Sequence, residues 1–115
     1  MNKEDHLGKA KEIEDSLSRL RQDLDWALII EGIYNSSLQY IAYYCETKYN
    51  DHTDIHAGLE KYLRNLGETN LERMFSELNH LRMGRWYGGK KNGESAKRAF
   101  EIMNAIKEEA LGVKK

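Results

Sequence analysis

The chain has 115 residues, of which 40% are hydrophobic and 32% are charged, and its net charge is −1. This length is typical of one domain with one core, and the absence of proline argues against collagen, rigid linkers and many-turned β-sandwiches. The single cysteine excludes a disulfide framework within the chain and indicates a reducing compartment. No apolar run approaches the roughly 20 residues of a membrane span, so we expect a cytoplasmic protein without membrane contact.

Apolar residues recur every three or four positions over residues 4–30, which predicts an amphipathic helix roughly 40 Å long. The pattern breaks at Glu31-Gly32, so a turn is expected there. Asn35 or Ser36 is then expected to cap a second helix over about 36–49.

Helical spacing also dominates the rest of the chain. A third helix is predicted over about 54–66, with Gly67 as its C-terminal stop. A fourth helix begins near Thr69 and ends at a glycine pair, and a fifth covers about 94–111. Because the connections are short, neighbouring helices are expected to be antiparallel. We therefore predict an all-α single domain over residues 1–115, an up-and-down antiparallel bundle of four to five helices.

Positive charge is concentrated in residues 82–98, which we call the basic segment. It holds six basic residues against one acidic residue, so the remainder of the chain carries a net charge of −6. Such a segment is either a site for phosphate groups, including those of RNA, or a solvated loop with ordinary surface lysines. The candidate phosphate-binding residues in it are Arg82, Arg85, Lys90 and Lys91.

Arg82 is the most informative residue of this segment. It follows Leu81 and lies four positions after Leu78, at the edge of the apolar stripe, so it is expected to be half-buried and to need a partner. That partner is a carboxylate, a tyrosine hydroxyl or a bound phosphate. Tyr43 and Tyr44, on the tyrosine-rich second helix, are further candidate ligand-binding residues, because a tyrosine buries its ring while its hydroxyl reaches a cleft.

Metal and thiol chemistry are less well supported. His52 and His56 stand four residues apart, which suits two metal ligands on one helix face, but His52 is expected before the helix begins and no third ligand has a defined position. We therefore expect no metal site and no cofactor. Cys45 lies on the apolar side of its helix, where a buried and unreactive thiol is expected.

The order and spacing of several short motifs resemble those of the small stand-alone HEPN domains (higher eukaryotes and prokaryotes nucleotide-binding). The resemblance covers about residues 20–111. The motifs are Asp23-Leu24-Asp25-Trp26-Ala27, Gly32-Ile33-Tyr34-Asn35, Tyr43-Tyr44, His56-Ala57-Gly58-Leu59, Leu81-Arg82 with Tyr87-Gly88, and Glu94-Ser95-Ala96.

This resemblance implies a compact helical bundle that forms homodimers and, in some members, partners a minimal nucleotidyltransferase in a two-gene toxin–antitoxin-like module. It also implies a metal-independent ribonuclease motif, in which an arginine is followed after four to six residues by a histidine. Arg82 matches the arginine, but Tyr87, Gly88 and Gly89 occupy the positions of the histidine. The catalytic pair is therefore half present. A tyrosine does not replace the histidine well, because its pKa near 10 makes it a poor general base at neutral pH.

Three hypotheses follow. The leading one is a dimeric module without catalytic activity that binds nucleotide or RNA phosphate, or a partner protein, near Arg82. An alternative is an endoribonuclease in which Arg82 holds the phosphate and Tyr87 or His80 donates a proton, although His80 is expected to point elsewhere on the helix. The third is a purely structural interaction module that uses the tyrosine-rich helix as its binding face.

Overall fold

A computed structural model describes residues 2–50, 58–87 and 93–113, with the backbone alone for residues 84–87 and 93. All regular structure in these residues is helical and none of it is strand, which confirms the predicted all-α fold. The five helices are α1 (Lys3–Leu17), α2 (Trp26–Tyr49), α3 (Leu59–Asn65), α4 (Thr69–Tyr87) and α5 (Gly93–Leu111).

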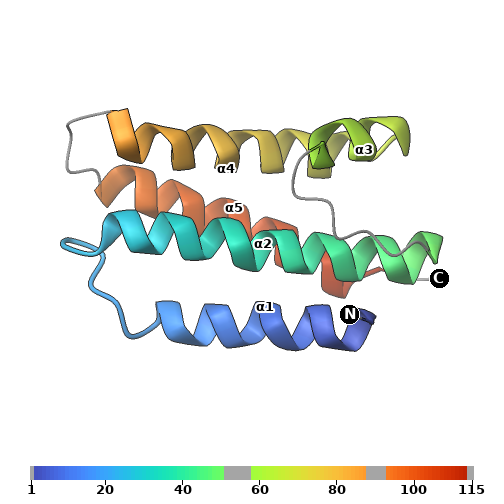
Figure 1. Ribbon diagram of the computed structural model, residues 1–115, viewed down its shortest axis with the longest axis horizontal. Helices are drawn as coiled ribbons and strands as arrows, with labels where there is room; N and C mark the ends of the chain where they lie inside the picture. Colours follow the sequence, from blue (N-terminus) through green and yellow to red (C-terminus); the bar gives the residue numbers. More distant parts are fainter. Residues whose placement is uncertain (1, 51–57, 88–92, 114–115) are drawn as a thin grey trace.

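Helix α2 is the central element of the bundle. Helix α1 packs along one side of it, α4 along the opposite side, and α5 lies behind (Figure 1). The packed pairs α1–α2, α2–α4 and α4–α5 are antiparallel, whereas α2 and α5 run in the same direction and are in contact. The short α3 packs against α4. Helix α2 is thus covered by three helices, α1, α4 and α5.

The boundary between the first two helices differs from the sequence prediction. A continuous helix over residues 4–30 is wrong, because α1 ends at Leu17 and a separate connection precedes Trp26. The Ser18 hydroxyl donates to the Asp15 carbonyl at 2.6 Å, and the backbone N–H of Arg21 donates to the Asp25 carboxylate at 2.9 Å. These local hydrogen bonds end α1 and shape the connection without any glycine or proline.

The predicted turn at Glu31-Gly32 is also wrong, since α2 continues through it. A Cβ atom on Gly32 would lie 2.5 Å from Leu17 Cδ2, so this glycine allows the end of α1 to approach α2 closely. Ser36, expected as a cap, instead donates its hydroxyl to the Ala10 carbonyl at 2.9 Å and ties α1 to α2. Asn35 lies within the helix as well.

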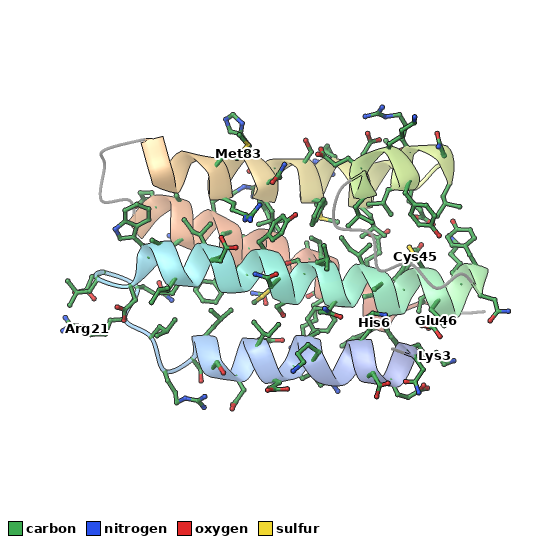
Figure 2. All side chains as sticks on the ribbon, in the orientation of Figure 1. Lys3, His6, Arg21, Cys45, Glu46 and Met83 are labelled. Atoms are coloured by element: carbon green, nitrogen blue, oxygen red, sulfur yellow. The ribbon has the colours of Figure 1, made fainter. Side chains whose placement is uncertain are left out.

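The remaining elements agree more closely with the prediction. Gly67 has a φ of +77° directly after α3, as expected of a C-terminal stop, and Cys45 is fully buried on α2 (Figure 2). The described part of α3 begins at Leu59 rather than near residue 54, and residues 51–57 lie outside the described residues. Among the described residues, no helix has both the length and the apolar character that a bilayer crossing requires.

Candidate functional site

Arg82 forms an ion pair between α4 and α2. Its Nε donates to both oxygens of Glu31, at 3.0 and 3.2 Å. The two side chains are 34% and 33% exposed, so the pair lies at the surface of the bundle, in reach of solvent. Of the three partners that the sequence left open, the structure therefore supplies a carboxylate. The next residue, Met83, lies on the outer side of α4 (Figure 2).

The guanidinium carbon of Arg82 lies over an aromatic ring. The Cζ atom of Arg82 is 4.3 Å from the centre of the Tyr34 ring, which itself packs against Phe75 with ring centres 5.1 Å apart. Burial raises the pKa of the Tyr34 hydroxyl, and the nearby charges of Glu31 and Glu60 raise it further against the opposing effect of Arg82. Tyr34 is therefore a neutral hydroxyl at physiological pH and a poor proton acceptor.

A cleft of about 400 Å³ opens beside this pair, between α2, the start of α3 and α4. Gly58, with a φ of +82°, turns the chain into α3 at the rim of the cleft. The wall combines one cation, one carboxylate, two side-chain amides and an apolar floor. Its lining residues are Tyr34, Asn35, Gly58, Leu59, Glu60, Phe75, Asn79 and Arg82.

The predicted tyrosines do not join Arg82. Tyr44 lies ten residues after Tyr34 on α2, about 15 Å along the helix axis, and its hydroxyl donates to the buried carboxylate of Glu68 at 2.9 Å. Lys48 donates to the Tyr44 hydroxyl at 3.0 Å. Tyr43 is half-buried and does not line the Arg82 cleft. The structure thus separates the tyrosine pair from the arginine that the sequence analysis grouped with it.

The tyrosine-rich helix is also not an exposed binding face. Tyr40 is fully buried and donates to Glu14 at 2.6 Å, and Tyr44 is 5% exposed. These two rings belong to the interior of a single chain, whereas Tyr43 and Tyr49 on the same helix are only partly buried. The third hypothesis therefore stays a prediction that could use only the second pair of tyrosines.

His80 lies on a different face of α4 from Arg82, as expected. Two residues correspond to a rotation of about 200° around a helix. The exposed His80 lines a separate shallow depression with Arg73 and Glu77. It is therefore poorly placed to donate a proton to a group held by Arg82.

Several predictions fall on residues whose side chains the structure does not describe. They concern Arg85, Tyr87, Lys90 and Lys91 of the basic segment, and the His52–His56 pair. Their roles stay predictions. Among the side chains that are described, no three histidine, cysteine, aspartate or glutamate residues gather as a metal site would require.

Sequence reasoning missed Glu31, Tyr34, Glu60 and Asn79. A usable signal was present for the first two, because positions 31 and 34 share one face of a continuous helix. The predicted turn at Glu31-Gly32 concealed this relation. Nothing in the local sequence indicates that Glu60 and Asn79 border the same cleft, because their proximity depends on how α3 and α4 dock.

Comparisons of this chain with protein-family models, with curated proteins and with solved structures found no match. The resemblance to HEPN domains therefore stays a prediction that rests on the motifs quoted above. The same holds for the homodimer and for the nucleotidyltransferase partner that it implies.

Proposed function

We propose that this chain is a HEPN-like cytoplasmic protein that binds the phosphate group of a nucleotide or of RNA in the cleft beside Arg82. The observation that carries the proposal is the position of Arg82, half-exposed at the wall of a cleft of about 400 Å³. Ligand sites commonly have volumes of roughly 300–1,000 Å³ and a few convergent polar groups.

The orientation of Arg82 suits an anionic ligand. The Tyr34 ring supports one face of the guanidinium, which reduces the number of rotamers that a ligand must immobilise. A guanidinium presents a planar fork of donors that matches the oxygens of a carboxylate or a phosphate. Within the chain Glu31 accepts from Nε of this fork, and a phosphate is a chemical equivalent of the carboxylate that carries more charge.

Glu31 consequently acts as an internal competitor. A phosphate that takes over Nε of Arg82 displaces a carboxylate that is one-third exposed, and this carboxylate regains water when it leaves. The exchange therefore costs little. The net positive charge of the basic segment attracts an anion toward this end of α4 and makes the affinity fall as salt is added.

Binding is better supported than RNA cleavage. The lining of the cleft includes no histidine among its described residues, and burial raises the pKa of Tyr34 away from the range of a general base. The half-present catalytic motif in the sequence agrees with this choice.

The test is the affinity of a fluorescently labelled short RNA, measured by anisotropy at low salt. Arg82→Ala should weaken binding at least about tenfold, the effect of losing one charge-assisted contact. Glu31→Gln should strengthen binding, because it removes the competitor and leaves Arg82 in place. Arg98→Ala is the matched control, since Arg98 also donates to both oxygens of a carboxylate, that of Glu77, outside the cleft.

Arg82→Lys separates a binding defect from a folding defect, because lysine keeps the positive charge and lacks the planar donors of the guanidinium. It should fold like the wild type and bind with intermediate affinity. Equal affinities in the wild type and in a folded Arg82→Ala variant would refute the proposal. An equal loss of RNA affinity in Arg82→Ala and Arg98→Ala would show that the RNA binds by nonspecific charge attraction and not in the cleft.

A further inference from the structure

The lining of the cleft beside Arg82 contains both a positive and a negative side chain. Arg82 provides a cation that is paired with Glu31 beside the cleft, and Glu60 of α3 provides the one carboxylate among the described lining residues. Glu60 and Tyr34 line the same cleft, so this carboxylate borders the space beside the ring over which Arg82 lies. A plain anion would be attracted by Arg82 and repelled by Glu60.

A ligand that satisfies both side chains carries hydrogen-bond donors at one end and an anion at the other. An ionised carboxylate only accepts hydrogen bonds, through its two oxygens. Among the common nucleobases, only guanine presents two adjacent donors, the ring N1–H and the exocyclic amino group, that meet both oxygens at once. Adenine and cytosine place an acceptor beside their donor and leave one carboxylate oxygen facing a lone pair.

The rest of the wall suits a base as well. Leu59 and Phe75 form a buried apolar floor against which a flat ring can lie. The amides of Asn35 and Asn79 border the same space, and they both donate and accept. Asn35 already donates to the Glu31 carbonyl at 2.8 Å, which fixes the direction of its side chain.

We infer that the cleft selects a guanine nucleotide, free or as an unpaired residue of RNA, with the carboxylate of Glu60 accepting from the guanine edge while Arg82 holds the phosphate. This inference rests on the proposed function. It adds a specificity-determining residue, Glu60, to a site for which the sequence analysis named only basic and tyrosine residues. Recognition of unpaired bases through their Watson–Crick edges is a general mode of sequence-specific RNA binding.

The experiment is calorimetric titration of the full chain with GMP, IMP and AMP at low salt. The wild type should bind GMP about tenfold more tightly than AMP, because AMP leaves a carboxylate oxygen unpaired. IMP should be intermediate, since it keeps the ring N1–H and lacks the amino group. In Glu60→Gln the preference for GMP should fall to about twofold or less, and AMP should bind at least as well as before, since an amide matches the donor–acceptor edge of adenine.

Glu77→Gln is the control, because this carboxylate lies on α4 outside the cleft and should leave the order of affinities unchanged. Equal binding of the three nucleotides, lost in Arg82→Ala, would overturn the guanine inference and leave the proposed phosphate site standing. A preference for GMP that survives Glu60→Gln would also overturn it. Absence of binding for all three nucleotides and for RNA would overturn both.

Discussion

Carboxylates meet cations near both ends of α4, and the two places differ in what surrounds them. Just before α4, the buried carboxylate of Glu68 accepts hydrogen bonds from Tyr44, Tyr49 and Lys48 of α2. Near the other end, the Arg82–Glu31 pair is one-third exposed and borders an open cleft. A buried charge must be fully satisfied within the chain, whereas an exposed pair can exchange one partner for a ligand.

This contrast explains why Tyr44 does not belong to the candidate site. Its hydroxyl is committed to Glu68 and Lys48, and burial raises its pKa, an effect that the hydrogen bond from Lys48 opposes. The tyrosine-rich end of α2 therefore stabilises the fold. The Arg82–Glu31 pair, at the other end of the contact between α2 and α4, is the part that can exchange a partner for a ligand.

The largest expected effect is on stability at Glu68. Glu68→Ala removes the acceptor of three donors, two of them tyrosine hydroxyls, so the free energy of unfolding should fall by about 2–4 kcal/mol. Urea denaturation followed by circular dichroism measures it. Glu77→Ala, which breaks an exposed pair with Arg98, should cost only a small fraction of that.

A smaller effect on stability is expected at the Arg82–Glu31 pair. Glu31→Ala should lower the free energy of unfolding by about 1 kcal/mol or less, because Arg82 can turn to water and keeps its contact with Tyr34. The same denaturation series provides the comparison. If Glu31→Ala cost as much as Glu68→Ala, the two regions would be equally structural and the contrast would fail.

Lowering the pH should selectively remove the stability that Glu68 contributes. Burial by itself raises the pKa of this carboxyl, but the hydrogen bonds from Tyr49, Lys48 and Tyr44 outweigh burial and leave the pKa below its ordinary value of 4.5. A lowered pKa means that the folded state holds its proton less tightly than the unfolded state. The resulting stability is present above pH 4.5 and is lost as the pH falls through the folded pKa.

The measurement is the midpoint of thermal unfolding of the wild type and of Glu68→Gln at several pH values. The advantage of the wild type at pH 7 should shrink steadily below pH 4.5. A difference that stays constant into the acid range would show that the charge of Glu68 contributes nothing to the network.

The smallest expected effect is a gain in stability when Glu109, a half-buried residue of α5, is replaced. Burial raises the pKa of this carboxyl, and repulsion from Glu68 adds to the shift despite the opposing charge of Lys48. Ionised Glu109 therefore destabilises the fold at pH 7, and this penalty shrinks as the pH falls through the raised folded pKa and is gone below pH 4.5. Glu109→Gln should raise the unfolding midpoint by about 1–3 °C at pH 7 and leave it unchanged in acid. A lower midpoint at pH 7 would contradict the assigned repulsion.

The helices of the C-terminal half were predictable because their ends carry local signals. Thr69 begins α4, and α5 ends at Leu111, beside Gly112, as the periodicity indicated. The boundary between α1 and α2 was not predictable in this way. Apolar residues such as Leu24 and Leu28 continue the helical spacing through it, yet they are 59% and 64% exposed. Contacts between the two helices, above all the approach of Leu17 to Gly32, override that pattern.

By itself, the sequence determined the all-helical class, the buried Cys45 and the need of Arg82 for a partner. Each of these follows from the spacing of apolar residues along one helix, which is local information. Only the tertiary structure decided that the partner is Glu31, that Tyr44 pairs with Glu68, and that Glu60 borders the cleft. These contacts join residues far apart in the sequence, and the docking of the helices that bring them together depends on the packing of the whole core.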